Sequence, residues 1–334
     1  MKIGILGAAR IAPEAVIKPA SRIAGVQITA VAARDGVRAT EYAAKHGIPR
    51  TYDSYEALLA DPGLDAIYNP LPNGLHGRWT IAALRAGKHV LCEKPYTANA
   101  DEARAVDEVA RETGLVAMEA VHYRYHPVAS RMIEIVRTGE LGPVRHVQAA
   151  LAGPVMRFSD IRYDLSLAGG ALMDPGCYAV HMVRSVTDAE PEVVAAEAKL
   201  HRPGLERAIR ADLRFADGST GQIISSLWSK DLIRLSVRVI GEHGELTVFN
   251  PLLPQKGHRL TVKRRGDRRR VEKLTKRPTY EFQLEAFAAA VRGEGPVLTD
   301  SADAVRTMSV IDDIYRAADL PLRQPAGTSR GVGK

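Results

Sequence analysis

The stretch KIGILGAARIA, residues 2–12, decides the fold class. Its first part, Lys2–Leu6, is a short apolar run of the kind that forms a buried strand. Gly7 then permits a tight turn, and a helical pattern begins at Arg10. A strand that passes through a glycine turn into a helix is the opening of a βαβ unit.

The same alternation of apolar runs and amphipathic stretches continues to about residue 122. Gly47, Gly87 and Gly114 each follow a predicted helix, as C-terminal caps do. The predicted strands are Lys2–Leu6, Val26–Ala33, Ala66–Tyr68, His89–Cys92 and Leu115–Ala120, with a short extended piece at Thr51–Tyr52. Strands that alternate with helices in this way are parallel. Residues 1–122 are therefore predicted to form a doubly wound α/β domain, which binds its ligand at the C-terminal ends of the strands.

The pattern changes after residue 122. Several β-like runs follow, and residues 207–215 alternate apolar and polar side chains, which is typical of a sheet with one face in water. The predicted runs are Val144–Leu151, Val193–Leu200, Arg207–Phe215, Thr220–Trp228, Ser236–Gly241, Glu245–Phe249 and Leu260–Arg264, with a helix over Gly170–Thr187. We predict an α+β domain over residues 123–324 with a large, mostly antiparallel open sheet. Residues 325–334 are predicted to be a disordered tail.

Composition narrows the class of protein. The chain has 334 residues, of which 46% are hydrophobic and 25% are charged, as is ordinary for a globular protein of about two domains. No apolar run approaches the ~20 residues of a membrane span, and the N-terminus does not resemble a secretory signal. Two cysteines, Cys92 and Cys177, cannot form a disulfide scaffold, so we expect a cytoplasmic protein.

The net charge of +7 lies in one segment. Residues 263–277, KRRGDRRRVEKLTKR, contain nine Lys or Arg and two Asp or Glu, and the rest of the chain has 37 residues of each sign. One interpretation is a solvated pair of strands with a turn at Gly266-Asp267. The other is a binding patch for phosphates or a partner. We see no recognisable nucleic-acid-reading module and expect no nucleic-acid partner.

The first turn has the form of a dinucleotide-binding motif. Gly7–Ala12 reads G-x-A-x-x-A, a variant of G-x-G-x-x-G/A, in which Ala9 stands where the second glycine lets the backbone approach a pyrophosphate and Ala12 allows close helix–strand packing. Small residues also fill strand–helix turns for purely structural reasons, but this turn opens a βαβ unit. We therefore predict that a nicotinamide dinucleotide contacts Gly7, Ala8, Ala9, Arg10 and Ile11.

The second strand indicates which nicotinamide cofactor is bound. It ends Ala33-Arg34-Asp35, and Arg38 follows one helical turn later. Two guanidinium groups suit a ribose 2′-phosphate, whereas Asp35 could still bond a ribose hydroxyl. The sequence favours NADP over NAD. The alternative is that these residues are only surface charges at a helix start.

The fourth strand ends in Glu93-Lys94-Pro95, where the ligand crevice should be. A lysine held there can donate to a substrate oxygen and stabilise a neighbouring anion. Taken alone, Lys94 could equally be a surface lysine. Pro95 fixes the local backbone, and a cis peptide bond is possible.

With these motifs in view, the chain resembles the Gfo/Idh/MocA family of NAD(P)-dependent oxidoreductases, whose signature is Glu-Lys-Pro at this position. The pattern is most similar to the branch that contains dimeric dihydrodiol dehydrogenase and NADP-dependent D-xylose 1-dehydrogenase. The resemblance extends over nearly the whole chain. It is carried by Gly7–Ala12, Tyr68–His76, Gly87–Pro95, Met118–Pro127, Gly169–Tyr178, Gly241–Gly244 and Tyr280–Val291.

The resemblance implies roles for further residues. Asp174 and Tyr178 match the family's Asp and its acid/base Tyr or His, and a spacing of four places both on one helix face. Lys94 would stabilise the Tyr178 phenolate, because a tyrosine with a pKa near 10 needs help at neutral pH. Asp174 would orient the substrate and Lys94, and the preceding glycine pair, residues 169–170, would let the backbone approach the nicotinamide. The cofactor residues implied in addition are Pro70, Leu71, Asn73, His76, Glu93, Lys94 and Arg162.

Pro175 departs from this pattern. It fits if the helix starts there, since proline is favoured in a first turn. If the helix is instead continuous, the geometry of Asp174 changes. His122 and His126 are four residues apart, but Pro127 interrupts a helix there and no acidic ligand follows at matching spacing, so we predict no metal site.

The implied reaction moves a hydride between nicotinamide C4 and a hydroxyl or carbonyl carbon of a sugar or related cyclic polyol. The substrate could be an aldose oxidised at C1, a keto-sugar reduced at C3 or a trans-dihydrodiol. Two alternatives within the family are a catalytically inactive, cofactor-sensing regulator and a nicotinamide-dependent glycoside-cleaving enzyme. The resemblance implies a homodimer or a dimer of dimers, because the second-domain sheet of this family often pairs through its open face.

Overall fold

The computed structural model describes residues 1–228 and 233–327. The chain divides into two compact units. Unit 1 comprises Met1–His122 together with Tyr280–Val305, and unit 2 comprises Tyr123–Thr279 together with residues 306–327. The tail predicted over residues 325–334 lies mostly outside the described residues.

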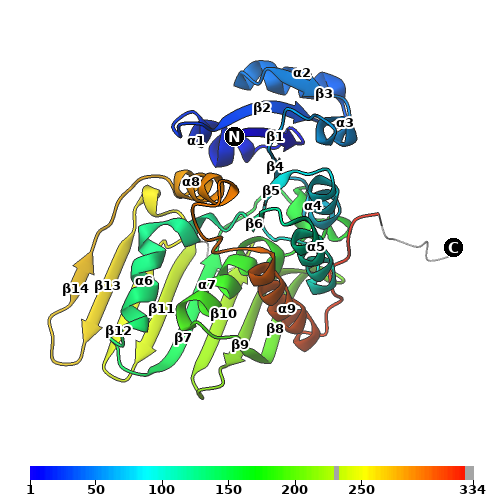
Figure 1. Ribbon diagram of the computed structural model, residues 1–334. Helices are drawn as coiled ribbons and strands as arrows, with labels where there is room; N and C mark the ends of the chain where they lie inside the picture. The colour runs from blue at the N-terminus through cyan, green and yellow to red at the C-terminus, as the bar shows by residue number, and fades with distance from the viewer. Residues whose placement is uncertain (229–232, 328–334) are drawn as a thin grey trace. The chain divides into compact units, whose positions relative to one another are not determined.

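Unit 1 contains a parallel sheet with strand order β3-β2-β1-β4-β5-β6 (Figure 1). The order runs outward in both directions from β1, so the doubly wound prediction is confirmed. β1 and β4 are paired, but the chain continues from them toward opposite edges of the sheet. The crevice where such sheets bind ligands lies at the C-terminal ends of these two strands, where the strand order reverses. The strands are β1 (Lys2–Leu6), β2 (Gln27–Ala32), β3 (Arg50–Tyr52), β4 (Ala66–Asn69), β5 (His89–Cys92) and β6 (Ala117–Glu119).

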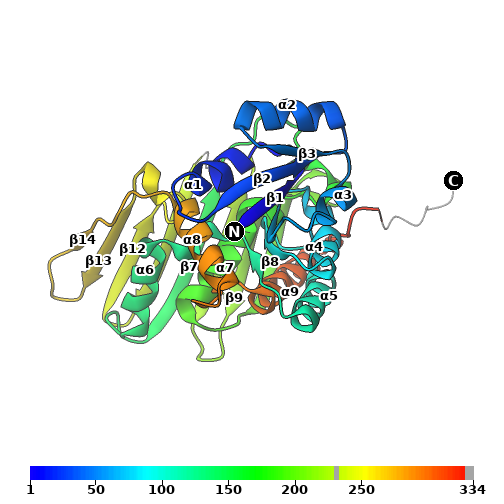
Figure 2. The ribbon, with the colours of Figure 1, turned by 45° about the horizontal axis from the view of Figure 1, so that its top comes forward.

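Three connecting helices of unit 1 begin at a residue whose side chain caps them. Asp35, Ser54 and Asn99 accept hydrogen bonds from backbone N–H groups at the starts of α2, α3 and α5. Helices α4 and α5 run side by side in both ribbon views (Figures 1 and 2). The helical segments are η1 (Pro13–Ile17), α1 (Lys18–Ala20), α2 (Gly36–His46), α3 (Tyr55–Leu59), η2 (Asn73–Leu75), α4 (His76–Arg85), α5 (Ala100–Thr113), η3 (His122–Tyr125) and α8 (Thr279–Val291).

The segment Tyr280–Val305 corrects the predicted domain boundary. We assigned it to the second domain, but it packs within unit 1. Thr299 bonds the edge of the sheet twice, because its carbonyl accepts the Glu119 N–H at 2.8 Å and its hydroxyl donates to the Glu119 carbonyl at 2.7 Å. The Tyr280 ring also lies 4.3 Å from the His122 ring. The sequence of residues 280–305 contains no local signal for these contacts. We therefore assigned the segment to the second domain from its position in the chain.

Unit 2 contains an eight-stranded sheet with strand order β14-β13-β12-β11-β7-β10-β9-β8. All of its neighbouring pairs are antiparallel except β10 and β7, which are parallel, so the prediction of a mostly antiparallel sheet is confirmed. The strands are β7 (Val144–Ala152), β8 (Glu192–Arg202), β9 (Leu205–Arg214), β10 (Thr220–Ser226), β11 (Arg234–Gly241), β12 (Gly244–Phe249), β13 (Arg259–Arg264) and β14 (Arg270–Glu272).

One face of this sheet is apolar and the other is polar. Side chains such as Ala149, Val237 and Leu246 are buried, whereas their strand neighbours on the opposite face, such as Arg210 and Arg238, are exposed. In Figure 1, α6 and α7 lie over the sheet. The helical segments of this part of the chain are α6 (Pro127–Arg137), η4 (Ile161–Tyr163), η5 (Leu165–Leu167), η6 (Leu172–Gly176), α7 (Cys177–Thr187), η7 (Pro254–Lys256) and α9 (Ser301–Ala317).

The basic segment forms the hairpin of β13 and β14. Gly266 adopts a left-handed φ of 83° in its turn, as the strand-pair interpretation requires. Arg270 is paired with Glu140 at 2.6 Å and with Glu272 at 2.8 Å, so part of the segment's charge is already neutralised within unit 2.

Candidate functional site

The predicted cofactor turn follows β1. Gly7 has a φ of 85°, and its N–H donates to the Ala32 carbonyl at 2.7 Å. A Cβ atom at Gly7 would stand 3.1 Å from Leu71 Cδ2, tighter than ordinary van der Waals contact, in a backbone conformation that side chains rarely adopt. Both the conformation and the space therefore require glycine at this corner of the crevice.

Two tyrosines that the sequence did not single out lie against this turn. The Tyr42 hydroxyl donates to the Ala9 carbonyl at 2.9 Å, and burial raises the pKa of Tyr42 to about 12. The Tyr55 hydroxyl lies 3.7 Å from the position that a Cβ atom of Gly7 would occupy. No motif marks either tyrosine, because each reaches the turn from a separate helix.

The predicted 2′-phosphate residues lie beside the same turn. Arg34 and Arg38 are exposed, and Arg38 Nη2 donates to the Ala8 carbonyl at 3.0 Å. Burial raises the pKa of Tyr55, and the charges of Arg34 and Arg38 oppose that shift. Asp35 Oδ1 accepts the N–H groups of Val37 and Arg38 as the cap of α2. Two cations at a glycine turn fit a phosphorylated ribose.

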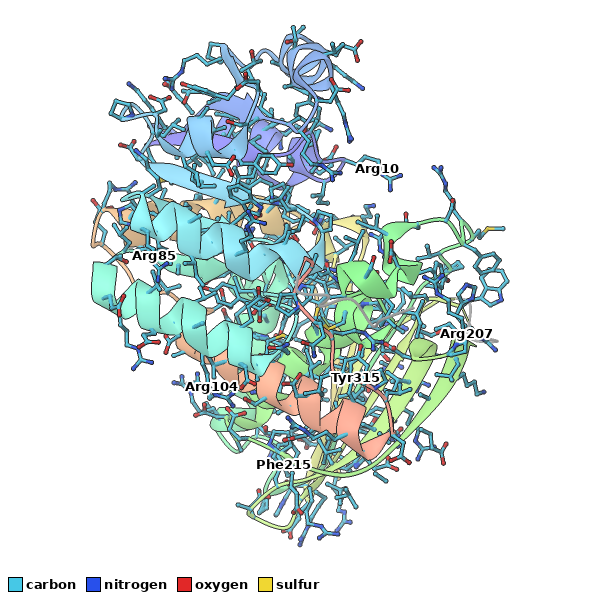
Figure 3. The ribbon with its side chains drawn as sticks, turned by 90° about the vertical axis from the view of Figure 1, so that its right-hand side faces the viewer. Arg10, Arg85, Arg104, Arg207, Phe215 and Tyr315 are labelled. Carbon is cyan, nitrogen blue, oxygen red and sulfur yellow. The ribbon has the colours of Figure 1, made fainter. Side chains whose placement is uncertain are left out.

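Arg10 and Ile11 lie at the far side of the turn. Both are exposed, and Arg10 projects outward in Figure 3. The N–H of Ala12 closes the turn by donating to the Ala9 carbonyl at 3.3 Å. All five residues predicted to contact the pyrophosphate therefore belong to one corner between β1 and the first helix.

The loop after β4 contains the next group of predicted residues, Pro70, Leu71, Asn73 and His76. The resemblance implies that His76 is a cofactor residue, and in the structure its ring is buried between two backbone carbonyls. Nε2 lies 2.6 Å from the Leu71 carbonyl and Nδ1 lies 2.7 Å from the Pro95 carbonyl. His76 therefore links the loop after β4 to the loop after β5.

Glu93 and Lys94 stand at the end of β5. The Glu93 carboxylate is buried, accepts the Tyr68 hydroxyl at 2.8 Å and accepts the Lys94 N–H at 3.3 Å. The Lys94–Pro95 peptide bond is cis. Lys94 itself is half-buried at the C-terminal edge of the sheet, where the sequence predicts the crevice.

In unit 2, the predicted Asp174 and Tyr178 lie on a helix with a local irregularity. Leu172–Gly176 forms a π-helical turn with Pro175 inside it, and α7 continues from Cys177. Pro175 has no N–H to donate, and the Ala171 carbonyl instead accepts the Gly176 N–H at 3.0 Å. The helix is therefore continuous through Pro175, with one wider i→i−5 turn just before α7.

The partner of Asp174 is Arg162. Arg162 Nε donates to Asp174 Oδ2 at 2.8 Å, and Nη1 donates to Asp160 Oδ1 at 3.0 Å. The Asp174 charge raises the pKa of the already strongly basic guanidinium. We predicted that Arg162 lies near the cofactor. Within unit 2 it fixes the carboxylate of Asp174 in one orientation.

Steric contacts within unit 2 explain why glycine occupies the two positions before this helix. A Cβ atom at Gly169 would stand 2.6 Å from the Arg162 carbonyl oxygen. A Cβ atom at Gly170, whose φ is 131°, would come closer than 3.0 Å to the carboxylate of Glu206. Within unit 2, both glycines are therefore required by the protein's own atoms.

Tyr178 belongs to an aromatic group. Its ring lies 6.2 Å from the Tyr123 ring at an angle of 70°. The Tyr123 hydroxyl lies 2.6 Å from His181 Nδ1, and His181 is buried one turn after Tyr178. These contacts restrict the Tyr178 ring, which is itself almost fully buried.

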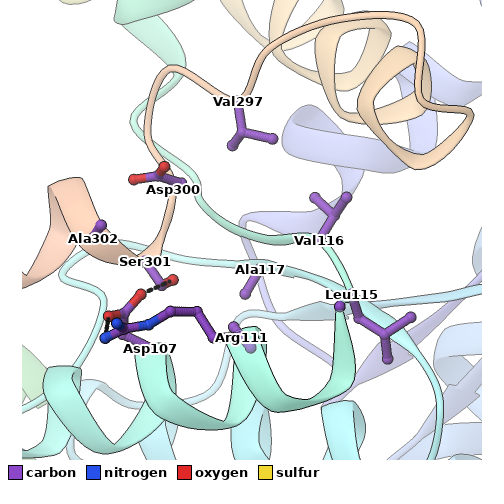
Figure 4. A pocket seen from close by; sticks show the side chains of 11 residues that line it. Asp107, Arg111, Leu115, Val116, Ala117, Val297, Asp300, Ser301 and Ala302 are labelled. Atoms are coloured by element: carbon purple, nitrogen blue, oxygen red, sulfur yellow. Dashed lines mark hydrogen bonds and ion pairs between the residues drawn. The ribbon is translucent and has the colours of Figure 1, made fainter.

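Another pocket of unit 1 lies away from these residues. It measures about 630 Å³ and is lined by residues that precede β6 and begin α9, with an Asp107–Ser301 hydrogen bond of 2.7 Å at its wall (Figure 4). It is therefore at the N-terminal edge of the sheet, opposite the edge that holds Gly7 and Lys94. Within residues 1–228 and 233–327, no group of three or more His, Cys, Asp or Glu side chains is arranged to hold a metal ion.

Comparison with known families matches both parts of the chain. Residues 1–121 match the model described as "Oxidoreductase family, NAD-binding Rossmann fold". Residues 130–247 match the model described as "GFO/IDH/MocA C-terminal domain".

Individual relatives extend over most of the chain. It is 40% identical to D-xylose 1-dehydrogenase (NADP(+)) 2 of Haloferax volcanii over 323 residues, which cover 96% of this chain and 98% of the relative. It is 34% identical to trans-1,2-dihydrobenzene-1,2-diol dehydrogenase of Bos taurus over 226 residues, 67% of each chain. A crystal structure of a 3-ketoreductase from Actinomadura kijaniata in complex with NADP and TDP-benzene superposes with a TM-score of 0.86 at 28% identity, covering 95% and 98% of the two chains.

Proposed function

Because the chain belongs to the Gfo/Idh/MocA family of oxidoreductases, we propose that it is an NADP-dependent dehydrogenase that oxidises the C1 hydroxyl of an aldose. The choice of an aldose as substrate rests on the 40% identity, over 96% of the chain, with an enzyme named for D-xylose and NADP(+). A keto-sugar reductase is the second candidate, because the structurally similar enzyme from Actinomadura kijaniata is a 3-ketoreductase.

The residues of unit 1 fit NADP. The left-handed Gly7 and the small residues Ala8 and Ala9 leave room at the backbone, and Arg34 and Arg38 supply two cations beside that turn. Pro70, Leu71, Asn73 and Glu93 lie on the loops that end β4 and β5, the same edge of the sheet. When bound, NADP⁺ accepts the hydride that leaves the sugar carbon, at C4 of its nicotinamide ring.

The remaining chemistry is a proton transfer by the chain's own residues. In the proposal, the Tyr178 phenolate removes the proton of the substrate hydroxyl as the carbon–hydrogen bond breaks. The Lys94 ammonium stabilises that phenolate and donates a hydrogen bond to the substrate oxygen. Arg162 holds the Asp174 carboxylate by a 2.8 Å hydrogen bond, and Asp174 accepts from a neighbouring sugar hydroxyl. The products are the lactone, NADPH and one proton.

A spectrophotometric screen of NADP⁺ with D-xylose and other aldoses, and of NADPH with keto-sugars, tests this proposal. We expect Lys94→Met and Tyr178→Phe each to lower the turnover by at least ~10²-fold. The control is Tyr52→Phe on β3, which should retain turnover. It removes only the hydroxyl that donates to Asp61 Oδ2 at 2.9 Å. Nearly unchanged turnover in both active-site variants would rule out the assignment.

The same screen separates the alternatives. Binding of NADP⁺ without turnover of any sugar would favour a cofactor-sensing protein, and release of free sugar from a glycoside without net NADPH would favour glycoside cleavage.

We also propose a homodimer formed through the polar face of the unit 2 sheet. Four strands contribute to a hydrogen-bonded row on this face, in which Gln148 accepts from Arg234 at 3.0 Å and donates to Gln222 at 2.8 Å, and Gln222 donates to Asp212 at 2.7 Å. Such a fixed row gives a regular surface on which a second copy can pair. Size-exclusion chromatography with light scattering measures the molar mass of the protein in solution. The mass of a monomer at micromolar concentration would contradict this proposal.

The proposed compartment is the cytoplasm. Cys92 and Cys177 are buried and are not disulfide-bonded, as a reducing compartment favours. Within the described part of the chain, no helix combines the length and the apolar character that a membrane crossing requires.

A further inference from the structure

A buried ion pair joins two distant segments of unit 2. Glu206 at the start of β9 is paired with Arg323, which follows α9 near the end of the described chain. The exposed fraction is 0% for Glu206 and 1% for Arg323. Charged side chains are almost never buried to this extent unless partners satisfy them. Their partners show what the pair holds in place.

The Glu206 carboxylate holds the start of the helix that carries Asp174 and Tyr178. Oε1 accepts the Leu172 N–H at 2.9 Å and the Tyr315 hydroxyl at 3.0 Å. The Glu206 carbonyl also accepts the Ala171 N–H at 3.2 Å. Two consecutive N–H groups at the beginning of the helix are therefore bonded to one residue of β9.

The Arg323 guanidinium holds the residue just before that helix. Nε donates to the Gly169 carbonyl at 2.7 Å, and Nη1 donates to the Gly204 and Pro321 carbonyls at 3.1 Å each. Its central carbon lies 4.2 Å from the centre of the Tyr315 ring, which α9 supplies (Figure 3). The planar fork of arginine makes these bonds at once, which the single ammonium of lysine cannot reproduce.

These bonds converge on one short piece of backbone, residues 169–172. On its other side, the Gly169 and Gly170 N–H groups donate to the Asp164 and Arg162 carbonyls, each at 2.9 Å. This backbone continues directly into the π turn with Asp174 and then into the first turn of α7 with Tyr178. A displacement of residues 169–172 would therefore move both side chains.

We infer that Glu206 and Arg323 are positioning residues, which fix the turn at residues 169–172 so that Asp174 and Tyr178 meet the substrate in reactive geometry; this inference rests on the function proposed above. Buried ion pairs add little net stability, because desolvation offsets most of their attraction. Directional bonds to three backbone groups of a catalytic turn do more, since a misplacement of about 1 Å can lower a rate by ~10²-fold.

The test compares two buried arginines of unit 2 in assays with D-xylose and NADP⁺. We expect Arg323→Lys to lower kcat at least ~10-fold and to leave the KM for NADP⁺ within about twofold, since the proposed NADP residues Gly7, Arg34 and Arg38 are untouched. The control is Arg184→Lys. Arg184 is also buried, binds Glu190 through two bonds of 2.6 Å, and lies near the far end of α7. It should lose stability to a similar extent and retain kcat within about twofold.

Glu206→Gln provides a second, isosteric variant in case Arg323→Lys does not fold. It keeps an oxygen for the Leu172 N–H but removes the charge that orients Arg323, and we expect a smaller fall in kcat with the same unchanged KM for NADP⁺.

Two results would overturn the inference: a wild-type kcat in the folded Arg323→Lys or Glu206→Gln protein, or an equal fall in Arg184→Lys. Failure of the proposed function is a separate result, because either the wild-type protein would not turn over D-xylose with NADP⁺ or Tyr178→Phe would retain turnover, whatever the positioning variants do.

Discussion

Replacement of Gly170 by alanine should destabilise unit 2 by an amount that the structure lets us divide into two parts. The first part is backbone strain, because a φ of 131° is essentially reserved for glycine and costs other residues about 1–3 kcal/mol. The second part is a collision, since the new Cβ atom would come closer than 3.0 Å to the Glu206 carboxylate. The carboxylate must then move away from the Leu172 N–H and the Tyr315 hydroxyl, which it holds at 2.9 and 3.0 Å.

Hydrogen bonds to a charged group contribute about 1.5–3 kcal/mol each, and part of this is lost when the carboxylate shifts. We therefore expect Gly170→Ala to lower the free energy of unfolding by about 3–6 kcal/mol. Gly257→Ala is a matched control in the same unit. Gly257 has a φ of 108°, and a Cβ atom there would meet no other atom within 4 Å. The control should lose only the strain, about 1–3 kcal/mol.

Urea denaturation followed by tryptophan fluorescence measures both variants. The sequence has two tryptophans, Trp79 in unit 1 and Trp228 in unit 2, so a Trp79→Phe background reports on unit 2 alone. The difference between the two alanine variants isolates the collision with Glu206. If Gly170→Ala and Gly257→Ala lose the same free energy within about 1 kcal/mol, the reasoning about Glu206 is refuted.

Three further predictions concern other parts of the molecule. Exchange of Arg34 and Arg38 for serine should raise the KM for NADP⁺ at least ~10-fold and leave that for NAD⁺ nearly unchanged, because only the 2′-phosphate needs the two cations; steady-state kinetics with both cofactors would contradict this if the two KM values rose together. Asp35→Ala should lower the free energy of unfolding of unit 1 by about 1 kcal/mol through loss of the α2 cap, measured by urea denaturation in a Trp228→Phe background, and Asp35→Asn should retain most of it. Burial, reinforced by the charge of a neighbouring histidine, lowers the pKa of His126 to about 4. Because the unfolded chain takes up this proton near pH 6.5, stability that is present above that pH should be lost as the pH falls toward 4, by about 1–2 kcal/mol after allowance for solvent screening. His126→Asn, which can still accept the Val128 N–H, should flatten this part of the stability profile, and an unchanged profile would count against the assignment.

Local sequence was sufficient for most of unit 1 and for the elements of unit 2. The parallel strands, the glycine that turns at the end of β1 and the helix caps depend on residues a few positions apart, so periodicity and turn chemistry reveal them. The roles proposed for Asp174, Tyr178 and Lys94 rest on family motifs, which indicate chemistry without showing contacts. The hairpin of the basic segment followed from its Gly266-Asp267 turn.

Two features depended on partners that the sequence does not locate. The sequence left open whether a helix starts at Pro175 or continues through it, and the structure shows the second case, because the Gly176 N–H takes the place of the missing donor in a π turn. The family resemblance gives His76 as a cofactor residue, and only the structure shows that its ring contacts two carbonyls, one from each neighbouring loop. In both cases the deciding partner is a backbone group whose position the sequence pattern does not contain.

The sequence by itself therefore determined the order of strands and helices, the glycine turns and the residue types that carry the chemistry. Only the tertiary structure decided which distant segments meet. In the tertiary structure, residues 280–305 pack at the edge of the first sheet, and Arg323 contacts Gly169 and Glu206. The physical reason is range: backbone conformation responds to neighbours along the chain, whereas a buried charge is satisfied by whichever partner the fold places beside it, 117 residues away in the case of Glu206 and Arg323.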